Sequence, residues 1–184
     1  FCLLSLQYIG STLGHVSLIK SLIAVVIGFL AVMLFMVIFY RVPGLFAGFA
    51  LLFYLVLLLA LFKVIPVTLT LAGIAGVILS VGMAVDANVL IFSRMREELK
   101  EGKGFLVAME EGFVRAWPSI RDGNLTTLFV SMILFWFGSS FVQGFALTLS
   151  LGIVLSMFSA IVVTRNLLRM FAGTFFEKLT WLWK

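Results

Sequence analysis

The sequence predicts an all-α fold, a polytopic membrane helix bundle with five transmembrane helices, and three observations lead to this class. Of the 184 residues, 63% are hydrophobic and 11% are charged, whereas a soluble domain carries about a quarter charged residues. Several apolar runs approach the roughly 20 residues that a helix needs to cross a bilayer. Short segments that contain proline, glycine or charged residues separate these runs and indicate turns.

The turns define the expected spans. In "RVPG", Pro43 cannot continue a helix and Gly44 permits the chain to reverse. "KVIPVT" and "GSS" mark two further turns between apolar runs. The expected spans are Ile19–Tyr40, Leu45–Phe62, Leu69–Phe92, Ile120–Phe137 and Phe141–Thr164.

The segment 94–119 has a different character from the spans on either side. It opens with the charged stretch "RMREELKEGKG", in which Glu97 and Lys100 lie on one helical face. Apolar residues then recur every four positions, at Phe105, Met109, Phe113 and Trp117. This period is typical of an amphipathic helix, which we expect to lie in the membrane interface and to end at Pro118.

Basic residues predict the orientation of the bundle 19–164. Five spans place its two ends on opposite sides of the membrane, with Lys20 and Lys63 on one side. The other side would hold eleven: Arg41, Arg94, Arg96, Lys100, Lys103, Arg115, Arg121, Arg165, Arg169, Lys178 and Lys184. Basic residues gather on the cytoplasmic side, so segment 94–119 and the basic, aromatic, interfacial tail 165–184 are expected there. The N-terminal side is expected to be periplasmic.

The chain begins at Phe1 rather than at methionine, and its N-terminus is expected outside without a signal of its own. We therefore expect at least one further span upstream. Residues 1–18 would then be the tail of a missing periplasmic domain.

Asp86 is an acid inside an apolar span. It lies six residues before Phe92, or about 9 Å from the expected cytoplasmic end of the apolar stretch. A charge at such depth costs on the order of 2.5–3.5 kcal/mol or more, whereas an intramembrane hydrogen bond returns only about 0.6–2 kcal/mol. The residue type therefore favours an intramembrane proton carrier over a neutral side chain that only joins two helices, although the second interpretation stays open.

A relay needs polar partners near Asp86. Asn124 and Thr127 open the fourth span and are candidate members of a proton path. Asp122 is a less favoured candidate, because an acid at a helix start is an ordinary cap. Asn88 faces a different direction from Asp86 on a helix. No Arg or Lys falls at membrane depth, so a counter-ion would come from another chain. Glycines 44, 48, 73, 76 and 82 indicate close helix packing.

Other classes of function lack support in the sequence. His15 is the only histidine and has no nearby carboxylates, and Cys2 is the only cysteine, so no internal disulfide can form. No phosphate-binding glycine loop precedes a Lys-Ser/Thr pair, and the net charge of +5 is explained by topology. We expect no catalytic residue, cofactor, metal or nucleic-acid partner, and a transport subunit rather than an enzyme.

Four separated motifs carry a resemblance to a known family. They are "GMAVDANVLIF", "RMREELKEGK", "GFVRAWPSIRDGNLTTL" and "GFALTLSLGIVLSMFSAIVVTR", in this order. Together with "STLGHVSLIKS" and "FYRVPGLFAGFALLFYLVLLLAL", they cover nearly the whole chain. The chain resembles the SecD/SecF family of protein-export membrane proteins, and within it the C-terminal membrane half of the SecD branch.

The resemblance implies a fold of the resistance-nodulation-division superfamily, in which the five spans are spans two to six of a six-helix half. It implies an accessory subunit of the Sec translocase in the bacterial inner membrane, which uses the proton gradient to assist polypeptide export. Asp86 aligns with the family's intramembrane acid. The implied partners are SecF, fused or separate, the SecYEG channel and the translocating preprotein. The alternatives are a proton-coupled small-molecule exporter of the superfamily and a non-catalytic scaffold of the translocon.

Overall fold

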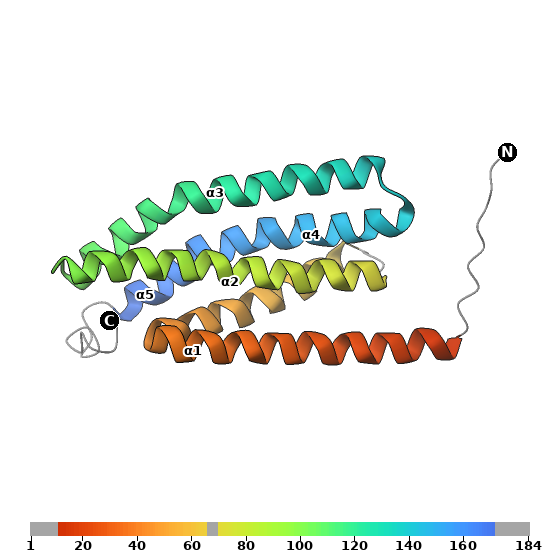
Figure 1. Ribbon diagram of the computed structural model, residues 1–184, viewed down its shortest axis with the longest axis horizontal. Helices are drawn as coiled ribbons and strands as arrows, with labels where there is room; N and C mark the ends of the chain where they lie inside the picture. The colour runs from red at the N-terminus through yellow and green to blue at the C-terminus, as the bar shows by residue number, and fades with distance from the viewer. Residues whose placement is uncertain (1–10, 66–69, 172–184) are drawn as a thin grey trace.

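The computed structural model describes residues 11–65 and 70–171, and this part of the chain is helical throughout apart from short turns (Figure 1). The fold is therefore all-α, as expected. The elements are α1 (Ser11–Val64), α2 (Leu71–Lys100), α3 (Phe105–Phe137), α4 (Ser140–Phe158), the π-helix η1 (Ser159–Thr164) and α5 (Arg165–Phe171). Residues 1–10, 66–69 and 172–184 lie outside the described part, and with them most of the predicted tail 165–184.

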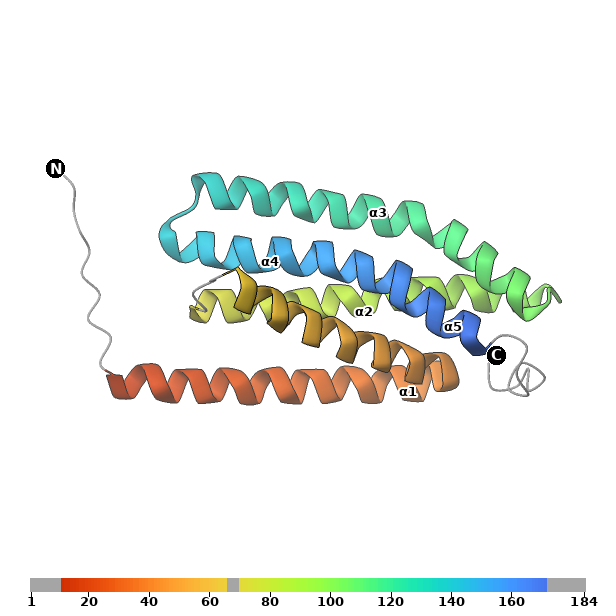
Figure 2. The same cartoon turned by 180° about the vertical axis from the view of Figure 1, so that it is seen from behind.

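Helix α1 is a hairpin of two helical limbs that fold back on each other (Figures 1 and 2). The reversal is at Arg41, whose backbone has φ 47° and ψ −114°. A Cβ on Gly44 would lie 2.1 Å from the carbonyl oxygen of Met36, so only glycine lets the limbs approach this closely. The turn predicted at "RVPG" is confirmed. The first limb begins at Ser11, earlier than Ile19.

Helix α2 is the central helix, because it packs against α1, α3, α4 and η1. Small residues let α4 approach it. The Thr148 hydroxyl donates a hydrogen bond to the Gly73 carbonyl at 3.0 Å, and a Cβ on Gly76 would lie 2.3 Å from the Thr148 hydroxyl oxygen. Gly82, which the sequence grouped with these glycines, has open space around it.

Helix α3 corrects one boundary, because it runs without a break through Pro118 to Phe137. The amphipathic segment and the fourth expected span are therefore one helix. Most of the apolar stripe of this segment packs inside the bundle, although Trp117 at its end is exposed. Phe105 and Met109 are buried, and a Cβ on Gly112 would meet the backbone nitrogen of Met95 at 2.8 Å. Packing against α2 on both sides of the proline outweighs the one backbone hydrogen bond that proline cannot make.

Three helical stretches are long and apolar enough to cross a membrane: Ile19–Val64, Leu71–Lys100 and Ser140–Met170. The first is the hairpin, so these stretches contain four of the five expected spans. Among the described residues, 120–137 does not reach the same hydropathy, because Arg121, Asp122 and Asn124 stand at its start. The count of five spans stays a prediction.

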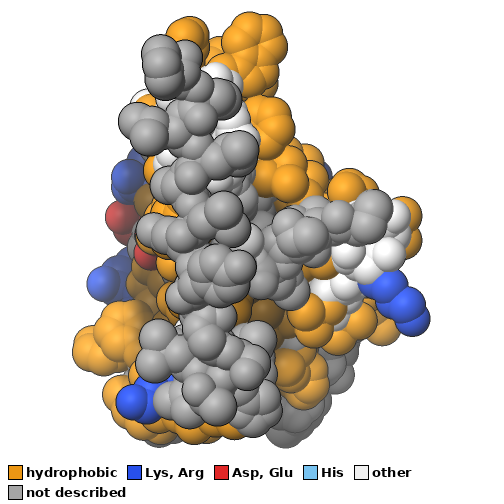
Figure 3. All heavy atoms as spheres, turned by 90° about the vertical axis from the view of Figure 1, so that its right-hand side faces the viewer, with side chains coloured by type: hydrophobic (Ala, Val, Ile, Leu, Met, Phe, Trp, Pro, Cys, Tyr) orange, Lys and Arg blue, Asp and Glu red, His pale blue; other side chains and the backbone are white. Residues whose placement is uncertain are grey.

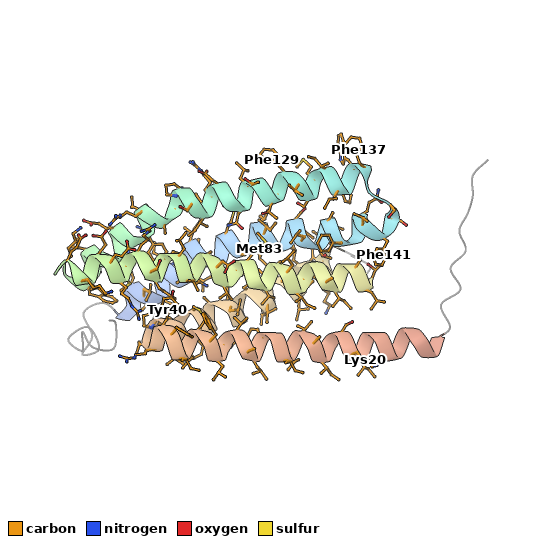
Figure 4. All side chains as sticks on the ribbon, in the orientation of Figure 1. Lys20, Tyr40, Met83, Phe129, Phe137 and Phe141 are labelled. Atoms are coloured by element: carbon orange, nitrogen blue, oxygen red, sulfur yellow. The ribbon has the colours of Figure 1, made fainter. Side chains whose placement is uncertain are left out.

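The outer surface of the bundle is apolar. Among the described side chains visible from the end with the 138–139 turn, hydrophobic ones predominate (Figure 3). Phe129, Phe137 and Phe141 on α3 and α4 are 59%, 84% and 60% exposed, and the first two lie on the outer side of α3 (Figure 4). Such a surface suits a hydrocarbon environment, and the fold is a polytopic membrane helix bundle.

We predict that Gly76→Ala destabilises the bundle by about 1–3 kcal/mol, the usual cost of overpacking. The added methyl group would collide with the Thr148 hydroxyl and with the backbone oxygen of Phe145, 2.8 Å from the new Cβ. Thermal unfolding in detergent measures the effect, and Gly82→Ala is the matched control on the same helix. Equal midpoints for the two variants would contradict the packing described for α2 and α4.

Candidate functional site

Asp86 lies in the middle of α2, fourteen residues before its last residue, Lys100, or about 21 Å along the helix. Its side chain is exposed at the surface of the bundle. Within the part of the chain that the structure describes, the Asp86 carboxyl group makes no hydrogen bond and no ion pair. The predicted proton carrier is thus an accessible acid at the centre of a helix that is apolar enough to span a membrane.

A groove of about 280 Å³ between α2 and α3 contains the three residues that the sequence singled out. Asp86, Asn124 and Thr127 all line it, although 38 residues separate the first two in the sequence. The other lining residues are Met83, Ala87, Leu90, Ser119, Ile120 and Gly123. The fold therefore brings the predicted site residues together on one surface.

The two neutral members of the groove are held by their own helix. The Asn124 side-chain amide is mostly buried and donates to the Ile120 carbonyl at 2.8 Å. The Thr127 hydroxyl donates to the Gly123 carbonyl at 3.1 Å. One N–H group of Asn124 and the Thr127 hydroxyl hydrogen are thus engaged, which leaves the second Asn124 N–H to donate, and the Asn124 amide oxygen and the Thr127 lone pairs to accept, hydrogen bonds.

A second hollow of about 580 Å³ lies on the other side of Asp86, between α2 and the first limb of α1. It is lined mainly by apolar side chains, among them Val32, Phe35 and Val89. Met83 lines both hollows and stands near the middle of α2 (Figure 4). No Lys or Arg among the described residues lines either hollow, so this part of the chain offers Asp86 no counter-ion.

Asp122 takes no part in the groove. It is exposed, and its carboxylate pairs with the neighbouring Arg121 at 2.8 Å. Because α3 continues through this position, Asp122 does not cap a helix start either. It provides a carboxylate on the same bundle that is separate from the candidate site.

One buried polar pair was missed by the sequence analysis. Asn88 is 3% exposed, and its side-chain oxygen accepts a hydrogen bond from the Thr164 hydroxyl at 2.9 Å, while its side-chain nitrogen donates to the Ala84 carbonyl at 3.3 Å. Asn88 does face away from Asp86, as expected. The sequence does show that Asn88 and Thr164 are polar residues in two otherwise apolar runs. Their spacing does not indicate that the two side chains meet.

A cluster of ion pairs joins α2 to α3 at one end of the bundle. Glu98 has no exposed surface, and both Lys103 and Arg115 bond its carboxylate. Lys103 also pairs with Glu111, and the two carboxylates, Glu111 first, raise the pKa of its ammonium group. Glu97, which shares a helical face with Lys100, pairs with Arg94 at 2.8 Å.

The same end holds α1 and α5. Arg165 and Arg169 of α5 pair with Glu110 of α3, and Arg165 is the main cause of the lowered pKa of the Glu110 carboxyl group. Arg96 of α2 donates to the Phe39 carbonyl at 3.2 Å and lies over the Tyr40 ring, beside the bend of α1. We call this end, with the residues named in this and the preceding paragraph, the charged end.

The described residues contain no group of three or more His, Cys, Asp or Glu placed to hold a metal ion. What the site offers chemically is a titratable carboxyl group beside neutral hydrogen-bonding groups in a groove. Such a set can take up, pass on and release a proton.

The comparisons with known proteins agree with a polytopic membrane helix bundle. Residues 2–174 match the family described as "Protein export membrane protein SecD/SecF, C-terminal". The chain belongs to this family of polytopic export-membrane proteins. Within it, the chain corresponds to the C-terminal membrane half of SecD, as its relatives show.

Relatives named protein translocase subunit SecD are about half identical to the chain. That of Thermobaculum terrenum is 52% identical over 98% of this chain and 36% of its own length, and that of Synechocystis is 53% identical over 87% and 34%. A crystal structure of SecDF from Thermus thermophilus, described as a translocon-associated membrane protein, superposes with a TM-score of 0.87 at 40% identity, covering 90% of this chain and 23% of that one. The chain thus spans about a third of the length of these SecD relatives.

We predict that Glu98→Gln lowers the thermal midpoint of the protein well below that of Glu97→Gln. Glu98 is buried and pairs with Lys103 and Arg115, which would lose their charged partner. Glu97 forms an exposed ion pair, which contributes little to stability. Differential scanning measurements on both variants in detergent test this. A larger loss for Glu97→Gln would show that the charged end is not held by Glu98.

Proposed function

We propose that this chain forms the proton-carrying membrane part of an accessory subunit of the Sec protein translocase, which uses the proton gradient to assist export of polypeptides. Asp86 is the proton carrier, and Asn124 and Thr127 are relay residues. One observation carries the proposal. Asp86 is an exposed, unpaired carboxyl group in the middle of a membrane-length helix, in one groove with the two predicted relay residues.

An exposed carboxylate at this depth cannot face lipid without a large cost. The face of α2 between α1 and α3 therefore needs a further protein surface packed over it, one that supplies water or a cation to Asp86. We propose that SecF, as a separate or fused chain, supplies this cover and the counter-ion. The structure named SecDF that superposes on this chain supports the choice of partner.

The energies are compatible with proton coupling. One charge that crosses a potential of 100 mV is worth about 2.3 kcal/mol. A shift of about two units in the pKa of a carboxyl group corresponds to a similar free energy, about 2.7 kcal/mol. A membrane potential is thus large enough to drive protonation and deprotonation of one acid in each cycle.

The proposed orientation follows from the charged end. It holds the Arg and Lys residues that pair with Glu98, Glu110 and Glu111, and basic residues favour the cytoplasmic side of a bacterial inner membrane. We propose that this end and the chain's C-terminus are cytoplasmic, and that residues 1–18 emerge on the periplasmic side. We propose that the full-length subunit, rather than this chain alone, contacts SecYEG and the exported polypeptide.

We predict that Asp86→Asn in the full-length subunit abolishes its contribution to export at normal abundance and normal association with SecF. Asparagine keeps the shape and a hydrogen-bonding group but cannot ionise. The measurement is secretion of a reporter protein in cells that carry the variant. Asp122→Asn, the same change outside the groove, is the matched control and should export normally.

Normal export by Asp86→Asn would reject the proton-carrier role and favour a scaffold in which Asp86 only packs against a neighbour. Export that fails equally in Asp122→Asn would point to a general effect of lost acidic charge instead of to the groove.

A further inference from the structure

The π-helix η1 is tied at both of its ends to other helices through side-chain hydroxyls. The hydroxyl of Ser159, its first residue, donates to the Ala50 carbonyl of α1 at 3.1 Å. The hydroxyl of Thr164, its last residue, donates to the side-chain oxygen of Asn88 on α2 at 2.9 Å. Ser159, Thr164 and Asn88 are all buried, so each bond lies out of contact with solvent.

Several hydroxyls of this bundle bond only within their own helix, whereas those of Ser159 and Thr164, like that of Thr148, also reach a neighbouring helix. The hydroxyls of Ser93, Thr127 and Ser156 donate to carbonyls three or four residues earlier on their own helix. A hydroxyl bonded within its own helix leaves that helix free to rotate against its neighbours. A hydroxyl bonded to another helix fixes the rotation, and η1 is fixed in this way to both α1 and α2.

A π-helix holds one more residue in its turn than an α-helix does. If η1 changed to the α-helical register, the residues after it would rotate by about 100°, the angle per residue of an α-helix. The residues directly after η1 are those of α5, where Arg165 and Arg169 pair with Glu110 of α3. These pairs therefore depend on the register of η1.

We propose that Asn88 and Thr164 are a positioning pair that holds η1 in its π register and thereby couples the centre of α2 to the Arg165–Glu110 pair at the charged end. Asn88 is two residues from Asp86 on the same helix. Loss of the Thr164–Asn88 bond releases η1 and moves the two arginines of α5 away from Glu110. The coupling stands on the contacts named above, whereas its use in proton transport rests on the proposed function.

The test compares Thr164→Val with Thr164→Ser in the full-length protein in lipid nanodiscs. Valine has the shape of threonine without the hydroxyl, and serine keeps the hydroxyl. Hydrogen exchange followed by mass spectrometry reports on the backbone amides of α5, Arg165–Phe171. We expect exchange in α5 to become about tenfold faster in Thr164→Val and to stay near the wild-type rate in Thr164→Ser.

A double variant separates positioning from plain packing. Thr164→Val alone leaves the Asn88 oxygen buried without its donor, which destabilises the protein, whereas Asn88→Leu with Thr164→Val removes both polar partners. We expect the double variant to regain thermal stability while α5 still exchanges fast. Slow exchange of α5 in the stable double variant would overturn the proposal. So would unchanged exchange in Thr164→Val. If Thr164→Val does not accumulate, the double variant decides.

The proposed function and this coupling fail separately. Normal export by Asp86→Asn would reject the proton carrier and leave the exchange result of Thr164→Val valid. Unchanged α5 exchange in Thr164→Val would reject the coupling, whatever the export assay shows.

Discussion

A polar group that faces hydrocarbon without a partner costs several kcal/mol, and the internal organisation of this bundle follows from that cost. Nearly every polar side chain of the inner helices is bonded within the protein. Tyr54 donates to Ser80, Thr148 to Gly73, and Ser131 shares a hydrogen bond with Ser150. Each of these bonds joins two different helices, so the requirement to satisfy polar groups also sets which helices lie side by side.

Among the described residues, Asp86 departs from this requirement as an exposed, unpaired acid in the middle of an apolar helix, and this departure marks the candidate site. Its carboxyl group is exposed between two hollows while the opposite side of α2 is buried against α4 and η1. One helix thus has a packed face that fixes its position and an open face that carries a titratable acid. An open face of this kind suits a second set of helices, which is why we assign the cover to SecF.

Much of the fold and of the site follows from the sequence, for physical reasons that particular residues illustrate. Gly44 fixes the hairpin of α1, because only glycine fits beside Met36. Asp86, Asn124 and Thr127 stand out because acids and amides are costly in apolar runs, and they share one groove. A helix end was predicted at Pro118, but α3 continues through it, because packing along α2 outweighs the local tendency of proline to end a helix. Asn88 and Thr164 were missed, because no spacing rule relates residues 76 positions apart.

The central claim is that Asp86 gains and loses a proton as the protein works. Infrared spectroscopy of the full-length subunit with SecF in lipid, recorded across pH and with Asp86→Asn as the blank, measures this directly. A proton carrier at Asp86 should give a carboxylic acid band, absent from the variant, that appears as the pH falls and disappears as it rises. A difference spectrum without such a band, or with a band that does not respond to pH, would contradict the claim.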